Sequence, residues 1–88
     1  MKDILLPARP RFYDLCVIYK LDYQTLLDIA ERAGVSSSVI DAMFTGDPVV
    51  RVHAEKVLAV FSQTMGHTWT MEGVKVPVIT PERLVHHV

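Results

Sequence analysis

The chain has 88 residues, of which 9 are basic and 10 acidic, half are hydrophobic, and the formal net charge is −1. This length allows one domain with a compact core, which a dimer interface would help to stabilise. No run of about 18 apolar residues is present, which excludes a membrane span, and the start MKDILLPARPRF is too interrupted by charge and proline for a secretory signal, so we expect a cytoplasmic protein.

The first ten residues form an arm that precedes the helices. An apolar run at residues 4–6 predicts either an edge strand or a segment that packs over the core. Pro10 suits the first turn of a helix, where a missing amide leaves no hydrogen bond unmade.

A first helix is expected from residue 12, because apolar residues recur there at helical spacing. Its second apolar face needs cover from another part of the chain or from a partner. The single cysteine cannot form an internal disulfide, and we expect a buried, reduced thiol. Residues 21–23 connect this helix to the next. The expected core face is Phe12, Leu15, Cys16 and Tyr19, and the second face is Tyr13, Val17 and Ile18.

The most informative stretch is residues 25–46, TLLDIAERAGVSSSVIDAMFTG, which predicts two short amphipathic helices joined by a tight turn. We place these helices at residues 25–33 and 36–44. Gly34 follows the first apolar stripe, where a left-handed conformation lets the chain turn sharply. Ser36 is a good N-cap for the second helix, because its hydroxyl can accept a hydrogen bond from a free amide.

A fourth helix is expected at about residues 51–65, with Gly66 at its end. The sequence contains no internal repeat and no low-complexity linker. We therefore divide the single domain into an arm at residues 1–10, a helical core at residues 11–66 and a C-terminal extension at residues 67–88.

The C-terminal extension alternates apolar and polar residues and leaves two interpretations open. It forms a β-hairpin that turns at residues 72–73, or Thr70 caps one helical turn and only residues 74–79 are extended. Both make residues 74–79 the favoured strand, which Pro77 confines to an edge. We expect these residues to be ordered, with cover from residues 4–6, from the second face of the first helix, or from a second copy.

A spaced pattern runs through the two helices of residues 25–46. It consists of Ala30, Gly34, Val35, Ser36, Ile40 and Gly46. In these positions the chain resembles the phage-repressor (lambda repressor-like, Xre-type) family of DNA-binding domains, over about residues 24–61. The resemblance implies an all-α, compact domain of four to five helices with a helix-turn-helix, whose second helix enters the major groove. Residues 80–83 have the composition of a further helix start. The extended C-terminal tail lies outside the resemblance.

The resemblance also implies where DNA would be contacted. The family usually has Gln, Asn, Arg or Lys on the outer face of the second helix and Gln at the start of the first, where this chain has Leu26. Serine can bond base edges or phosphates, and Asp41 can accept from a cytosine amino group. The base-reading candidates are Ser36, Ser37, Ser38, Asp41 and Thr45. The phosphate-binding candidates are Gln24, Lys20, Arg51, His53, Arg9 and Arg11.

Charge is the feature that opposes DNA binding. Residues 23–65 contain three basic and five acidic side chains, a balance of −2, whereas DNA-binding proteins usually have a basic footprint. Two hypotheses therefore stand: a homodimeric transcription regulator that binds double-stranded DNA, and a helix-turn-helix module that binds a protein through the first helix and the tail. Cations around the second motif helix would favour the first hypothesis, and acids there the second.

No pattern predicts catalysis or a metal centre. The serines lack a nearby base at usable spacing, and there is no glycine-rich phosphate loop. The adjacent His86 and His87 point in different directions, and no further ligand lies at metal-binding spacing. We expect a protein that is not an enzyme and that needs no cofactor or metal.

Overall fold

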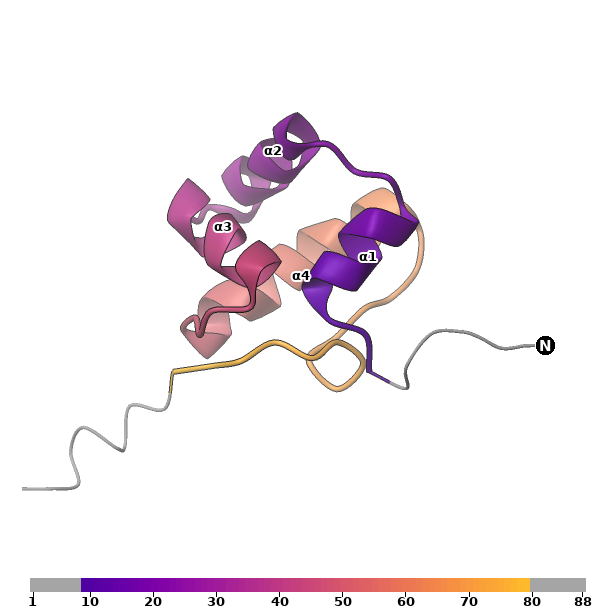
Figure 1. The fold of residues 1–88 in the computed structure, drawn as a ribbon. Helices are drawn as coiled ribbons and strands as arrows, with labels where there is room; N and C mark the ends of the chain where they lie inside the picture. Colours follow the sequence, from indigo (N-terminus) through magenta and orange to yellow (C-terminus); the bar gives the residue numbers. More distant parts are fainter. Residues whose placement is uncertain (1–8, 80–88) are drawn as a thin grey trace, which may run out of the picture.

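The computed structural model describes residues 9–79, which contain four helices and no strand. Figure 1 shows the helices around a common core, with the segment that follows the last helix crossing below them. The expected all-α class is confirmed to the extent of a compact, mostly helical domain. The predicted run at residues 4–6 and the helix start at residues 80–83 lie outside the described residues. The helices are α1 (Phe12–Ile18), α2 (Tyr23–Ala33), α3 (Ser37–Thr45) and α4 (Arg51–Met65).

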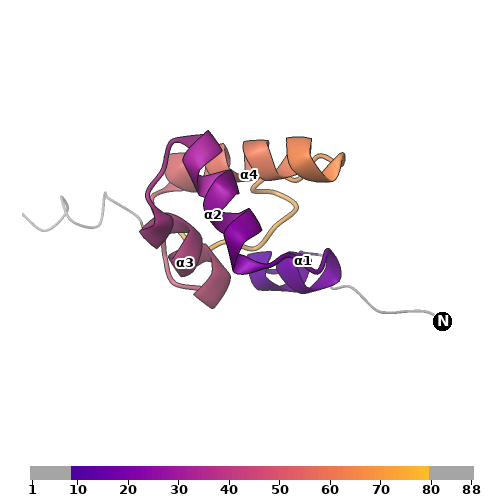
Figure 2. The ribbon, with the colours of Figure 1, turned by 90° about the horizontal axis from the view of Figure 1, so that it is seen from above.

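The apolar face of α4 occupies the centre of the core. It packs against both α2 and α3, and Figure 2 shows these two helices side by side next to α4. The ring of Phe61 lies 5.4 Å from that of Phe12 and 5.8 Å from that of Tyr19, measured between centroids. Burial of one such side chain stabilises the fold by about 1.5–3 kcal/mol. The fully buried residues of α4 are Ala54, Val57, Leu58 and Phe61.

A left-handed glycine joins α2 to α3, as predicted. Gly34 has φ 75° and ψ 28°, and the Val35 amide then donates to the Ala30 carbonyl at 3.0 Å. This bond closes the end of α2 and turns the chain back so that α3 packs against it. α3 ends in the same conformation at Gly46.

α2 begins two residues before the predicted start, because Asp22 caps it. The Asp22 carboxylate accepts from the Thr25 hydroxyl at 2.7 Å and from the Thr25 amide at 2.9 Å. These two hydrogen bonds hold the pKa of Asp22 below its ordinary value. The sequence pattern predicted this aspartate only as part of a connection, and its capping role is seen in the structure.

The other two capping predictions have different outcomes. Ser36 is the N-cap of α3, as predicted, but its hydroxyl bonds the Ser38 hydroxyl at 2.7 Å and not a backbone amide. Pro10 precedes the N-cap of α1 and does not lie in its first turn. The cap is instead made by Arg11, whose amide donates to the Asp14 carboxylate at 2.9 Å.

After α4 the chain makes one helical turn, which decides between the two interpretations of the extension. The Thr70 carbonyl accepts from the amides of Gly73 and Val74 at 2.9 and 3.0 Å. No hairpin forms in the described part of the extension. Residues 74–79 are extended, but the predicted strand is reduced to two isolated parallel bridges.

These bridges attach residues 74–79 to two distant segments. Lys75 pairs with Arg11 at the N-cap of α1, and Val78 pairs with Val49 in the loop before α4. Within the described residues, this segment pairs only with these two single residues, and the predicted partner at residues 4–6 lies outside the described residues. Val74 and Val76 are both buried in the main core.

The second apolar face of α1 is not the cover for this segment, contrary to one of the predicted arrangements. Tyr13, Val17 and Ile18 keep 41%, 54% and 48% of their surface exposed. The extended segment instead packs against the core residues beneath the helices. An apolar surface therefore remains open on α1.

We expect Gly34→Val to lower the free energy of unfolding by about 1–3 kcal/mol. No heavy atom lies within 4 Å of an added Cβ at Gly34, so the cost comes from the positive φ and not from a collision. Gly73→Ala is the matched control, since its added Cβ meets only the Thr70 carbonyl oxygen at 3.8 Å. Chemical denaturation followed by circular dichroism measures both, and wild-type stability of Gly34→Val would contradict the analysis.

Removal of residues 74–79 should destabilise the domain. A chain that ends at Gly73 is compared with one that ends at Ile79, so that both lack the last nine residues. The shorter chain loses the fully buried Val74, whose burial alone stabilises the fold by about 1.5–3 kcal/mol. Thermal melting should therefore occur at a lower temperature, and coincident melting curves would show that the segment is not part of the core.

Candidate nucleic-acid interface

The outer face of α3 is a row of short polar side chains. Ile40 and Met43 point into the core and are buried. The structure places the predicted base-reading residues on the opposite side of the helix. Their side chains are short and end in a hydroxyl or a carboxylate. The exposed residues of this face are Ser37, Ser38, Asp41 and Thr45, with Ser36 at the cap.

Several of these polar groups already have partners within the chain. The hydroxyls of Ser36 and Ser38 bond each other, and the Thr45 hydroxyl lies 3.0 Å from both the Asp41 carbonyl and the Asp47 carboxylate. All of these groups are exposed, and hydroxyls rotate, so the bonds can be exchanged for others. The described residues offer no hydrogen-bond partner to the side chain of Ser37.

A tyrosine from α2 fixes the one carboxylate of the α3 face. The Tyr23 hydroxyl donates to Oδ1 of Asp41 at 2.8 Å. Chiefly because of this hydrogen bond, the pKa of the Tyr23 phenol is raised above its ordinary value. The bond connects the start of α2 to the middle of α3, and no sequence pattern signals it because the two residues are 18 positions apart.

Two of the predicted phosphate-binding arginines are engaged in the fold. Arg9 donates from Nη2 to the carbonyls of Met71 and Val74, at 2.9 and 3.3 Å, and so anchors the turn after α4. Arg11 donates to the Asp14 carboxylate from Nε at 3.1 Å and from Nη2 at 2.8 Å. The side-chain hydrogen bond from Arg11 is the main reason that the pKa of Asp14 is lowered.

The other phosphate-binding candidates are less constrained. Arg51, at the first position of α4, pairs with Glu55 at 3.0 Å, but both side chains are about half exposed and such a pair is weak in water. A phosphate could therefore replace Glu55. His53 is half-buried in the same turn, while Lys20 and Gln24 are exposed on either side of the start of α2.

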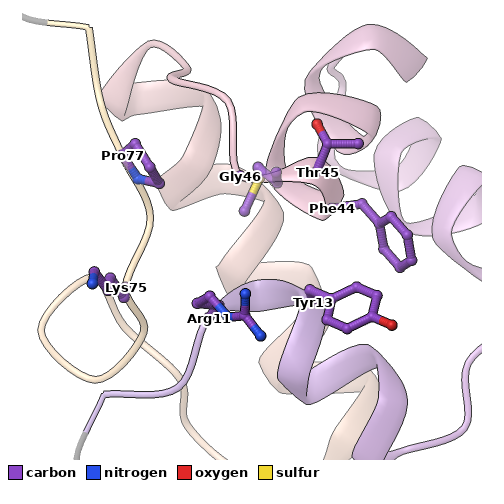
Figure 3. Close-up of a pocket in the computed structure, with 8 residues that line it drawn as sticks. Arg11, Tyr13, Phe44, Thr45, Gly46, Lys75 and Pro77 are labelled. Carbon is purple, nitrogen blue, oxygen red and sulfur yellow. The ribbon is translucent and has the colours of Figure 1, made fainter.

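The charge around α3 is mixed. The helix itself contains no cation, and it presents Asp41, with Asp47 directly after its end. Arg11 and Lys75 lie beside the C-terminal end of α3, where they line a groove of about 650 Å³. Figure 3 shows this groove with the rings of Tyr13 and Phe44 on its other side.

The groove is made from three segments that are far apart in the sequence: the start of α1, the end of α3 and the extended segment. For this reason no sequence pattern predicts the groove. The rings of Tyr13 and Phe44 meet edge to face, with centroids 5.0 Å apart. Its lining residues are Arg11, Tyr13, Met43, Phe44, Thr45, Gly46, Lys75 and Pro77.

The single cysteine is buried in α1, in agreement with the prediction. Cys16 forms no disulfide, and burial raises the pKa of its thiol to about 12. The thiol is therefore protonated at neutral pH, and a nucleophilic role is unfavourable.

Within residues 9–79, no three metal-ligating side chains gather in one place. None of the described helices is long and apolar enough to span a bilayer. His86 and His87 lie outside the described residues.

Comparisons of the chain with models of protein families, with curated proteins and with solved structures found no match. The contacts and charges described above are therefore the basis for assigning a function.

We expect the Tyr23 phenol to titrate above its ordinary pKa, and Asp41→Asn to lower that pKa by removing the charged acceptor. Carbon-13 NMR of ring-labelled tyrosine measures the titration. Asp47→Asn is the control, because Asp47 bonds Thr45 and not Tyr23. A Tyr23 pKa that is the same in wild type and in Asp41→Asn would contradict the observed contact.

Proposed function

We propose that the protein is a cytoplasmic DNA-binding transcription regulator of the helix-turn-helix type. The observation that carries this proposal is the row of short polar side chains along α3, which α2 supports from behind through the turn at Gly34. An α-helix is about 10–12 Å across and the major groove of B-DNA is about 12 Å wide, so a helix with short side chains can approach the base edges closely.

Asp41 is the residue best placed for base-specific recognition. Tyr23 holds its Oδ1, which orients the carboxylate and leaves Oδ2 as the acceptor for a cytosine amino group. Ser37 and Ser38 would bond neighbouring base edges or phosphates. This arrangement favours DNA sites with a cytosine at one position. It distinguishes one DNA sequence from another by hydrogen bonds to bases more than by charge.

Phosphate contacts are few under this proposal. Arg51 at the start of α4 and Lys20 before α2 supply the charge, and Gln24 adds a neutral donor. Each phosphate neutralised changes the slope of log affinity against log salt concentration by about −0.9, so one copy should give a slope of about −2. A homodimer that contacts two half-sites about 34 Å apart would double this slope. The second half-site would also compensate for the weak binding of a single copy.

A second candidate function is a protein-interaction module, and a specific observation favours it. Tyr13, Val17 and Tyr23 expose 41%, 54% and 54% of their surface, and Tyr13 packs against Phe44 of α3. The carboxylate of Asp41 lies on α3, as does Phe44. An exposed apolar surface beside an acidic group is typical of protein partners more than of nucleic acid.

The affinity for duplex DNA across a salt series distinguishes the two functions. We expect Arg51→Ala to weaken binding to all sequences about equally and to reduce the slope by about one unit. Arg32→Ala is the control, because Arg32 pairs with Asp28 and donates to Thr64 at the other end of α4.

Substitutions on the α3 face should have a different effect. Ser37→Ala or Asp41→Ala should change the preference among duplex sequences and leave the salt slope unchanged, since neither residue neutralises a phosphate. If a library of duplexes forms no complex at low salt in gel-shift assays, the protein-interaction function takes the place of DNA binding.

A further inference from the structure

We propose that the groove between α1, α3 and the extended segment is a binding site for a small aromatic carboxylate. The groove shares Thr45 with the α3 outer face, but the proposal does not depend on whether the protein binds DNA. Its volume of about 650 Å³ lies within the range of about 300–1,000 Å³ that is typical of small-molecule sites.

The apolar part of the groove is built to accept a flat ring. Tyr13 and Phe44 meet edge to face, which leaves ring surface of Tyr13 exposed, and Pro77 lies on the opposite side in Figure 3. Met43 is buried and also lines the groove, and its flexible thioether can adapt to the shape of a ligand. An aromatic ring placed between these groups would gain contacts of the kind that aromatic pairs prefer.

The polar part of the groove is formed by two cations, Lys75 and Arg11. Lys75 is on the side of Pro77, and the Arg11 guanidinium lies between the two sides, 5.6 Å from the centroid of the Tyr13 ring. No lining residue is acidic. The charge of Arg11 is balanced by Asp14, so Lys75 supplies the excess positive charge.

These two parts together define the ligand. A carboxylate beside Lys75 and Arg11 would receive charge-assisted hydrogen bonds, which are stronger than bonds between neutral groups. The attached ring would then lie against Tyr13 and Phe44. A neutral aromatic compound would gain only the contacts with the two rings. The negative charge of the ligand should therefore decide its affinity.

The test uses the full chain with two probes of equal shape, 2-naphthoate and the neutral 2-naphthamide. Isothermal titration calorimetry measures their affinities, and amide NMR shifts locate them. We expect naphthoate to bind about tenfold more tightly than naphthamide. The amides of Gly46 and Lys75 should shift with either probe.

Lys75→Gln separates charge from shape. It should weaken naphthoate about tenfold and leave naphthamide unchanged, and it should not unfold the segment, because the bond to Pro10 uses the Lys75 backbone amide. Lys56→Gln on α4 is the matched control, an exposed lysine that does not line the groove. Tyr13→Ala should weaken both probes, and its circular dichroism spectrum should remain that of the wild type.

Four results would overturn the proposal. The first three are equal affinity of the two probes, unchanged naphthoate affinity in Lys75→Gln, and shifts confined to residues outside the groove. The absence of binding by either probe at millimolar concentration would also reject the site, whether or not the protein binds DNA.

Discussion

The packing of α4 against the other helices is the contact on which the rest of the structure depends. Its buried face meets α2 and α3 directly, and the ring of Phe61 extends the core to Phe12 of α1 and to Tyr19. The turn at Gly34 joins α2 and α3, and the packing of both helices against α4 fixes the orientation of α3. The polar row on α3 is therefore held in place by apolar contacts behind it.

The extended segment gives the domain its second set of constraints. It connects the arm, the loop before α4 and the turn at Thr70, and Arg9 is held by two carbonyls of this turn and the residues after it. One cation is thus committed to the fold, and Arg11 is committed to capping α1. This accounts for the modest basic surface near α3.

Features that depend on neighbouring residues could be predicted from the sequence. The bounds of α4 and the left-handed turn at Gly34 follow from helical spacing and from one glycine. The cap at Asp22 is also local, but the apolar stripe alone placed the helix start at residue 25 and left Asp22 in the connection. The Tyr23–Asp41 bond, the contacts of Arg9 and the groove could not be predicted, because they join residues that only the tertiary fold brings together.

The most direct test of the central claim, that the outer face of α3 contacts DNA, is an NMR titration of the labelled protein with a duplex library at low salt. The account predicts that the largest amide shifts fall on Ser37, Ser38 and Asp41, with smaller shifts at Arg51. Shifts confined to Tyr13 and Val17 on α1, or no shifts at saturating duplex, would contradict it.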